Sequence, residues 1–418
     1  MWTANDANGQ PRGRAGEVHP SDGTDQPRLY YLDNLRLLLI VLVVVHHASQ
    51  PYGPADWWYV EDADGSPVLS TLSTVSGAFR MSLLFFVSAF LLPRSYDRKG
   101  GLRFLAERFR QFVPPILAGF LVLIPVLMYA YYLNFRDYGP IGFAAYYTDV
   151  YLGAGQRPDD WSGPIWPDRQ FGHLWFLQHL LVYAVLYTAW RGAGSLAAAW
   201  RSPRNPSSPR VRPGGQAPGT AAIAVFILVV SVATFVLRGW YPVDRWVPVL
   251  EFIQAEPADL AQYTAFFVLG ILAYRRGWLS AFSARAGYVW LGAGSALAAA
   301  HFVAEPWLGG VYATGGWNAG SLLWSTTETL MSTALSIGLL IAFREWVAGP
   351  SRLVRALAPV AFTVYVLHVP VVVALQYAVS GAPAGPLAAF GVVAAVGVVA
   401  GFALAWCVRR IPYLRALV

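Results

Sequence analysis

Ionisable side chains lie inside or at the ends of several long apolar stretches of this chain. Such groups are costly to place in hydrocarbon and are functional candidates by default. A neutral imidazole can accept a proton and a guanidinium can hold a phosphate, so the chemistry to look for is proton abstraction near a bound anion. The candidates include six of the seven histidines and are Asp33, Arg36, His46, His47, Arg80, His173, His179, Asp259, His301, Glu328 and His368.

The first apolar stretch holds Arg36 and His47, eleven residues apart. Eleven helical residues turn through about 1100°, three turns plus about 20°, and rise about 16 Å, so both side chains share one helix face. The spacing predicts Arg36 near the cytoplasmic mouth, where it suits a phosphorylated ligand, and His47 near the middle of the bilayer, where it suits a general base. Asp33 is one turn away and is expected to hold Arg36. His46 is rotated by about 100° from this face, which favours helix packing.

Glu328 lies one to two turns inside the outer end of its apolar stretch. It is a candidate to orient or deprotonate His47 or to bind a substrate. The alternative is a structural ion pair with Arg80, which has few other possible counter-ions and is itself a candidate substrate-binding group. Asp259 begins an apolar stretch at the outer face and needs no special role.

His173, Trp175 and His368 are further candidates for substrate binding. His173 is expected at an outer boundary, where it could bind an acceptor or donate a hydrogen bond to an oxyanion. A structural role is the alternative for each of the three. His179 and His301 are expected to be packing or interface residues.

The composition determines which elements must position these groups. With 56% hydrophobic and 13% charged residues and a mean hydropathy of +0.44, the chain is far poorer in charge than soluble domains, which carry about 25% charged residues. The sequence therefore predicts an all-α, polytopic transmembrane helical bundle, because a span needs about 20 apolar residues. The expected spans are 32–50, 71–92, 112–133, 172–190, 220–237, 259–275, 286–304, 321–343, 357–378 and 386–406.

The basic residues follow the alternation of these spans. With the N-terminus inside, the inside segments hold 23 Lys and Arg and the outside segments hold 5. Positive charge is retained in the cytoplasm, so both termini are expected there. The net charge of +7 thus reflects topology and does not indicate a nucleic-acid partner.

One integral domain, residues 30–410, is expected between a disordered cytoplasmic tail (1–29), which is not a cleavable signal peptide, and a short cytoplasmic tail (411–418). Residues 191–218 read as a flexible cytoplasmic linker within it. The single cysteine, Cys407, excludes a disulfide within the chain and a thiolate metal site, and no metal-ligand spacing is convincing. The outside loop 134–171 is either an interfacial aromatic belt or a sugar-stacking lid, with aromatic residues Tyr138, Tyr146, Tyr147, Tyr151, Trp161 and Trp166.

Several motifs occur in an order that resembles the acyltransferase-3 family of integral membrane acyltransferases. The first is Asp33-x-Leu35-Arg36 with the Arg-x10-His spacing to His47, and the second is the run from Phe85 to Leu92, in which Ala89 replaces a glycine of the family pattern. The others are the basic stretch 104–110 before Val113-Pro114, the run His173–Leu177 and the run Tyr365–Pro370. The pattern leans towards the glucans biosynthesis protein C-like branch.

The resemblance implies transfer of an acyl group, commonly acetyl or succinyl, from cytoplasmic acyl-CoA to a hydroxyl of a glycan or another acceptor. It implies that His47 is catalytic and that Arg36 helps to hold the donor. The CoA phosphates would meet Arg36 together with cytoplasmic arginines such as Arg94, Arg108 and Arg110. His47 would deprotonate the acceptor or take the acyl group itself, and the residues leave both routes open.

Acyl-CoA is expected as a donor substrate and no tightly bound cofactor is expected. The expected surroundings are lipid, in the inner membrane of a bacterium. The alternative function is a proton-coupled secondary transporter that uses the intramembrane histidines as a relay. A third possibility is a binding protein without turnover.

Overall fold

The computed structural model describes residues 29–53, 58–61, 65–136, 138–156, 170–201, 215–250, 253–308, 310–349, 351–382 and 385–415. Nearly all of the expected N-terminal tail, residues 202–214 of the expected linker, Trp161, Trp166 and residues 416–418 lie outside this range.

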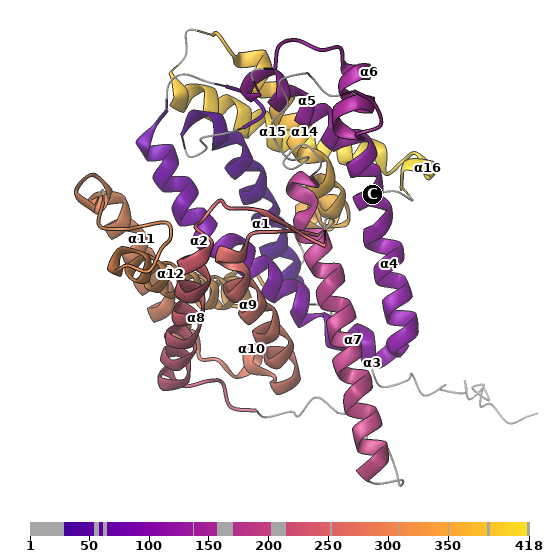
Figure 1. The fold of residues 1–418 in the computed structure, drawn as a ribbon. Coiled ribbons are helices and arrows are strands. Elements are labelled where there is room, and N and C mark those ends of the chain that lie inside the picture. Colours follow the sequence, from indigo (N-terminus) through magenta and orange to yellow (C-terminus); the bar gives the residue numbers. More distant parts are fainter. Residues whose placement is uncertain are drawn as a thin grey trace, which may run out of the picture.

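Long helices dominate the fold (Figure 1). They are α1 (Tyr30–Ser49), α2 (Pro67–Phe90), α4 (Gly101–Ala118), α5 (Ile124–Phe135), α7 (Trp175–Arg201), α8 (Thr220–Trp240), α9 (Pro257–Arg276), α11 (Ala284–Leu308), α12 (Ala319–Trp346), α14 (Ala361–Val379) and α15 (Pro386–Val408). A π-helical turn, Gly119–Leu123, joins α4 to α5. Each expected span falls on one of these helices, with α4 and α5 forming the third, and the all-α class is confirmed.

Short elements connect the long ones. The short helices are α3 (Leu92–Lys99), α6 (Phe143–Ala145), α10 (Trp278–Ala281), α13 (Arg352–Leu357) and α16 (Pro412–Arg415). Single turns of 3₁₀ helix cover Gln50–Tyr52, Gly172–Leu174 and Ala358–Val360, and a π-helical turn covers Tyr146–Tyr151. The strands β1 (Val247–Val249) and β2 (Ile253–Ala255) form an antiparallel hairpin in which Val247 lies opposite Ala255.

Within the described residues, eight helices are long and apolar enough to cross a membrane. The two remaining spans, α7 and α9, are less apolar because they carry polar side chains such as Gln178 and His179 in α7 and Asp259 and Gln262 in α9. These side chains are buried or half-buried within the bundle. These polar side chains therefore contact other parts of the protein.

Two boundaries differ from the expectation by eleven residues, the start of α4 and the end of α7. The third span begins at Gly101, eleven residues early, and Pro114 and Pro115 lie inside α4 without ending it. Helix α7 runs on to Arg201, so the segment from 191 to 201 is helical where a flexible linker was expected. That segment contains the run Ala197–Ala199, and alanine is the strongest helix former.

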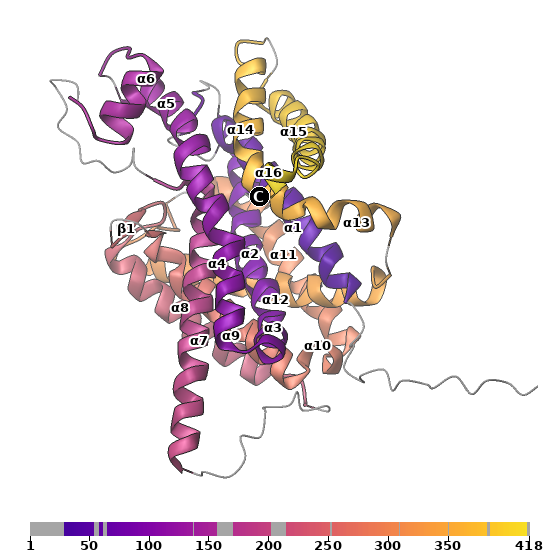
Figure 2. The same cartoon turned by 90° about the vertical axis from the view of Figure 1, so that its right-hand side faces the viewer.

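Helix α1 lies at the centre of the packing and contacts α2, α12, α14 and α15. Its side chains Leu35, Leu39 and Val44 are completely buried. The bundle then extends through α2 against α9 and through α12 against α11, and the two views agree that α4 and α7 lie side by side (Figures 1 and 2). Helix α1 is therefore enclosed by α2, α12, α14 and α15.

A glycine on α9 allows a close approach between α2 and α9. A Cβ atom added at Gly270 would lie 2.4 Å from the carbonyl oxygen of Phe86 and 3.0 Å from Cβ of Ala89. The alanine that replaces the family's glycine at position 89 is therefore accommodated, because the partner helix carries no side chain at the crossing.

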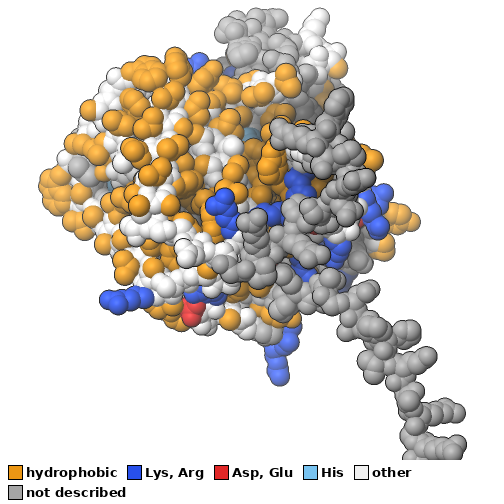
Figure 3. Space-filling view, turned by 90° about the horizontal axis from the view of Figure 1, so that it is seen from below, with side chains coloured by type: hydrophobic (Ala, Val, Ile, Leu, Met, Phe, Trp, Pro, Cys, Tyr) orange, Lys and Arg blue, Asp and Glu red, His pale blue; other side chains and the backbone are white. Residues whose placement is uncertain are grey.

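Lys and Arg side chains gather at the end of the molecule that carries α3 and α10, as the view from below shows (Figure 3). The outward faces of α8, α11 and α15 instead expose apolar side chains, including Leu228, Val289 and Val399. Exposed apolar faces on helices of this length fit a hydrocarbon surrounding.

Candidate functional site

A cavity of about 570 Å³ lies at the end of the bundle where α1 ends. The final turn of α1, the N-terminal and middle turns of α2, the beginnings of α9 and α12, the C-terminal part of α11 and the connections 243–256 and 310–314 all contribute to its lining. His47, Arg80, Glu328, His173 and Trp175, which sequence analysis selected, all line this cavity.

His47 lies in the last turn of α1. Its Nδ1 lies 2.9 Å from Nε2 of His368. Nδ1 of His368 lies 2.7 Å from the carbonyl oxygen of Tyr365. A carbonyl only accepts, so Nδ1 of a neutral His368 carries the proton and its Nε2 accepts from Nδ1–H of His47. Nε2 of His47 is then left with a lone pair.

Two residues that sequence analysis missed hold the His47 ring in this orientation. The Trp58 ring stacks on it with centroids 5.6 Å apart and planes 17° apart. Trp58 Nε1 donates to Gln376 Oε1 at 2.8 Å, and Gln376 Nε2 donates to the carbonyl oxygen of His47 at 3.0 Å. A glutamine in the apolar stretch 357–378 was a usable signal for Gln376, whereas nothing in the sequence distinguishes Trp58 from other loop tryptophans.

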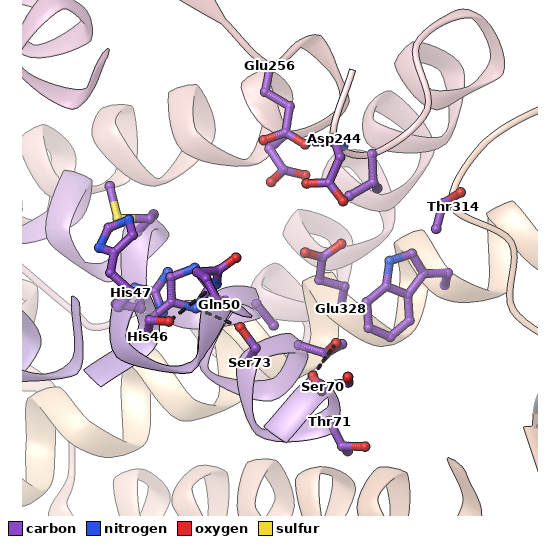
Figure 4. A pocket seen from close by; sticks show the side chains of 18 of the residues that line it. His46, His47, Gln50, Ser70, Thr71, Ser73, Asp244, Glu256, Thr314 and Glu328 are labelled. Atoms are coloured by element: carbon purple, nitrogen blue, oxygen red, sulfur yellow. Dashed lines mark hydrogen bonds between the residues drawn. The ribbon is translucent and has the colours of Figure 1, made fainter. Parts of the chain in front are cut away.

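His46 also lines the cavity, although its position on α1 favoured packing alone. Its Nε2 lies 3.1 Å from Nε2 of Gln50, which donates, so Nδ1–H of His46 donates to Ser73 Oγ at 2.7 Å. Figure 4 shows His46 and His47 side by side with Gln50 and Ser73 close to His46. A rotation of about 100° on a helix still leaves both neighbours facing a wide cavity.

Arg80 is a buried cation in the cavity, with 5% of its surface exposed. Its Nη1 donates to Ser76 Oγ at 3.1 Å. Within the described part of the chain no carboxylate lies in ion-pair distance of it. The alternative role of Glu328 as the ion-pair partner of Arg80 is therefore wrong, because Glu328 pairs with another arginine.

That arginine is Arg238, which sequence analysis assigned to an outside loop. Helix α8 extends to Trp240, three residues past the expected end, and so includes it. The side chain is 1% exposed, and its Nη2 lies 2.7 Å from Asp259 Oδ1 and 2.6 Å from Glu328 Oε2. Asp259, for which no role was expected, and Glu328 thus join α9 and α12 to α8. A pair of opposite charges at the outer ends of two neighbouring apolar stretches was the available signal.

His173 lies in the 3₁₀ turn before α7 and is 6% exposed. Its Nε2 donates to the carbonyl oxygen of Val366 at 2.9 Å, while Nδ1 has no hydrogen-bond partner among the described residues. The neutral ring therefore carries a buried, unsatisfied acceptor beside the cavity that His173 lines. The expected role as an oxyanion donor does not fit, because its one N–H is already engaged.

Glu256, just before α9, is a cavity residue that sequence analysis did not select. Its Oε1 accepts from the backbone N–H of Asp244 at 2.7 Å. Burial, followed by the carboxylates of Asp259 and Asp244, raises the pKa of Glu256 well above its usual value. Figure 4 shows Glu256, Asp244 and Glu328 directed towards a common space across from the two histidines.

Trp175, His179 and His301 have different surroundings: two of them line the cavity and one packs within the bundle. Trp175 lines the cavity and stacks on Tyr263 with centroids 5.6 Å apart. His179 bonds the carbonyl oxygen of Trp175 within α7 at 2.9 Å, which confirms packing. His301 is buried 5.5 Å from the Trp324 ring and also lines the cavity, so it is more than a packing residue.

Residues Tyr146 and Tyr151 of the long aromatic loop are completely buried in a second apolar cluster with Tyr132. Neither lines the cavity. These two side chains therefore form neither an interfacial belt nor a sugar-stacking lid, because the Tyr146 ring packs on Tyr132 of α5 and the Tyr151 ring packs on Tyr147.

Arg36 lies at the opposite end of α1 from His47. The expected contact with Asp33 is confirmed, with Nη1 3.8 Å from Oδ1. Arg36 does not line the cavity that His47 lines. The two are about 16 Å apart along the helix, and the intervening residues of that face, Ile40 and Val43, are buried.

The other candidate donor-binding residues lie on neighbouring elements at the Arg36 end. Arg94 is on α3, and Arg108 and Arg110 are on α4. Arg108 is close enough to Arg36 for the two charges to interact, and it donates to Gln111 Oε1 at 2.8 Å. None of them lines the cavity. Among the described residues, no group of three or more His, Cys, Asp or Glu side chains is arranged to hold a metal ion.

The chain is similar to proteins called glucans biosynthesis protein C from Salmonella heidelberg (strain SL476), Salmonella typhi and Salmonella typhimurium. Each is 26% identical over 253 residues, and the match spans 59% of this chain and 59% of the relative. No solved structure matches. The sequence profile of the acyltransferase-3 family, described as an acyltransferase domain, matches residues 29–408. With that match across most of the chain and a many-helix membrane fold around a histidine-lined cavity, the chain belongs to the acyltransferase-3 family of membrane acyltransferases.

Proposed function

We propose that this membrane acyltransferase moves an acyl group, acetyl or succinyl, from acyl-CoA to a hydroxyl of a glycan. The observation that carries the proposal is the His47–His368–Tyr365 chain, which leaves a lone pair on His47 Nε2 in a cavity large enough for a substrate. The relatives named for glucan biosynthesis support a glycan acceptor.

As a general base, His47 takes the hydroxyl proton at Nε2 while the hydroxyl oxygen attacks the thioester carbonyl. The tetrahedral intermediate then collapses, the C–S bond breaks, and the thiolate receives the proton from His47. His368 accepts the hydrogen bond from Nδ1–H of His47 throughout and stabilises the imidazolium. Arg80, a cation without a carboxylate partner among the described residues, is the group suited to the oxyanion.

The second route also uses His47 Nε2. Here the nitrogen attacks the thioester, the thiolate leaves, and an acyl-imidazole forms that the hydroxyl later attacks. Incubation with the donor alone separates the routes, because only the second leaves an acyl group on His47 that mass spectrometry of the denatured protein detects.

The donor is proposed to enter from the Arg36 end. Its phosphates would contact Arg36, Arg94, Arg108 and Arg110, and the pantetheine arm would run along the face of α1 towards His47. This path requires Ile40 and Val43 to move, since both are buried. The protein is proposed to be a multi-pass protein of a bacterial inner membrane with both termini in the cytoplasm, so the acceptor enters from the opposite side, past the connections 243–256 and 310–314.

The test uses the purified protein in nanodiscs with radiolabelled acetyl-CoA or succinyl-CoA and candidate glycans. His47→Ala should reduce transfer by at least about 100-fold, the usual contribution of a positioned general base. His179→Gln, a histidine outside the cavity, is the matched control and should retain activity. Arg36→Ala should raise the KM for the donor. Undiminished transfer in His47→Ala would refute the proposal, as would proton-coupled flux in proteoliposomes without thioester cleavage.

A further inference from the structure

Among the described residues, the wall of the cavity across from His47 carries the carboxylates of Glu256, Asp259 and Glu328 around a single contacting arginine. Asp244, Glu256, Asp259 and Glu328 lie on this wall. The cation bonded to it is Arg238, whose Nη2 contacts both Asp259 and Glu328. The raised pKa of Glu256 has its cause here, because burial and two neighbouring carboxylates disfavour its charge. A positive ligand group would relieve this repulsion.

These carboxylates reach one space from separate elements. Asp244 and Glu256 come from the connection before α9, and Glu328 comes from α12. Figure 4 shows the three directed towards that space, with the histidines of α1 on its other side. A ligand between the two walls would therefore touch both a carboxylate and His47.

A second and independent observation points to a ligand that donates hydrogen bonds. His173 is 94% buried, lines the cavity, and has an Nδ1 acceptor without a partner among the described residues. An acceptor left unsatisfied in a buried site is costly unless a bound molecule supplies a donor. Hydroxyl and ammonium groups both supply one.

Aromatic rings lie beside the carboxylates. Trp175 and Trp246 have centroids 5.4 Å apart, and both line the cavity with Tyr263. Ring faces attract cations and the apolar faces of sugar rings. A metal ion does not fit this wall, since no metal-binding group of His, Cys, Asp or Glu is formed among the described residues. We therefore take the ligand group that balances these carboxylates to be an organic cation.

We propose that the acceptor of this cavity is a hydroxylated amine, such as an amino sugar, whose ammonium group binds at Glu256 and Glu328 while its hydroxyl faces His47. This inference rests on the proposed function and names its acceptor class. The carboxylate wall binds the ammonium, the rings bind the carbon skeleton, and His173 Nδ1 accepts from a second hydroxyl. Repulsion from the same wall disfavours an anionic acceptor.

The test compares three pyranoses that differ mainly in charge: glucosamine, glucose and glucuronate. With the labelled donor and the protein in nanodiscs, ester product is measured so that acylation of the amine is not counted. Glucosamine should have a kcat/KM about tenfold or more above that of glucose, the size expected for one hydrogen bond to a charged group. Glucuronate should be used less than glucose.

Two variants test whether Glu256 causes the preference for glucosamine. Glu256→Gln keeps an oxygen that can accept from the Asp244 N–H, and it should abolish the preference for glucosamine over glucose. Glu345→Gln is the matched control, because Glu345 pairs with Arg344 in the last turn of α12, away from the cavity. It should keep the preference. Equal use of glucosamine and glucose by the native protein, or an unchanged preference in Glu256→Gln, overturns the proposal.

Binding separates this inference from the proposed function. Quenching of tryptophan fluorescence by each sugar is measured without donor. Saturable binding of glucosamine that Glu256→Gln removes supports the acceptor site even if no acyl transfer occurs. Transfer to glucose and glucosamine at equal rates leaves the proposed function standing and overturns the acceptor class. Absence of Glu256-dependent binding also overturns it.

Discussion

At the scale of single residues, the proposed chemistry depends on which nitrogen of His47 carries the proton. The carbonyl of Tyr365 fixes the proton of His368, and His368 in turn fixes that of His47. The result is a positioned lone pair without any carboxylate in the relay. Glu328, the first candidate for this orienting role, instead contacts Arg238.

His368→Ala should therefore lower kcat by about 10²-fold, within the usual range for general catalysis, while the KM for the donor stays near its native value. The reason is that His47 loses the acceptor that holds its Nδ1–H and stabilises its charged form. Steady-state kinetics at varied donor concentration measure kcat and the KM for the donor separately. A rise in KM at unchanged kcat would contradict a positioning role, and His368→Asn, which can still accept a hydrogen bond, should recover part of the activity.

Glu256 supplies a prediction about pH and stability. Its pKa is raised in the folded protein, so the folded state holds the proton more tightly than the unfolded state, in which a glutamate titrates near about 4.3. The stability that the protonated group provides is present below that value and is lost as pH rises to the raised pKa.

Thermal melting in nanodiscs at a series of pH values tests this expectation. The Tm of Glu256→Gln relative to the native protein should increase as pH rises above about 4.3 and level off above the raised pKa. The charged groups facing this side chain are Asp244, Asp259, Glu328 and Arg238. A Tm difference that is constant with pH would show that Glu256 is not perturbed.

At the scale of elements, the cavity depends on close helix crossings. Helix α9 approaches α2 at Gly270, and α9 also carries Asp259 and Tyr263 into the cavity. Arg238 of α8 ties α9 to α12. A shift of α9 would therefore move one wall of the cavity relative to His47.

Gly270→Ala should destabilise the protein by about 1–3 kcal/mol, as overpacking of a close contact does. Its Cβ would lie 2.4 Å from the carbonyl oxygen of Phe86, which is backbone and cannot rotate away. Gly292→Ala in α11 is the control, because nothing lies within 4 Å of its added Cβ. Thermal melting should show a lower Tm for Gly270→Ala and no lower Tm for Gly292→Ala. Equal Tm values for both would mean that the crossing is not tight.

At the scale of the whole molecule, the excess of basic residues predicts which end faces the cytoplasm. Leu102 at the start of α4 and Leu250 in the β1–β2 connection are exposed leucines, at 87% and 84%, on segments assigned to opposite sides. They make matched reporters once Cys407 is replaced by serine.

Leu250→Cys should react with a membrane-impermeant maleimide in intact cells, and Leu102→Cys only after permeabilisation. The reason is that the segment 93–111 carries six Lys and Arg residues, which are retained in the cytoplasm. Gel-shift detection of the label measures both. The reverse pattern would invert the topology and place Arg36 on the outer side, away from acyl-CoA.

The sequence alone was sufficient for the class of fold and for the first catalytic candidates. Ten apolar stretches specify helices, because in hydrocarbon each backbone polar group must bond within its own segment. The Arg36–His47 spacing follows from helix geometry within one segment, as does the contact of Asp33 with Arg36. Local periodicity carries all of this information.

Only the tertiary structure decided which groups meet. His368 reaches His47 across 321 positions of sequence, and Trp58 and Gln376 complete the same support from two other segments. Arg238 was not placed in a helix, because α8 continues three residues past the end that hydropathy predicted. Contacts between helices depend on their crossing and rotation, which apolar periodicity does not encode, and so the sequence identified the histidine while the fold determined its proton acceptor and the acidic wall that faces it.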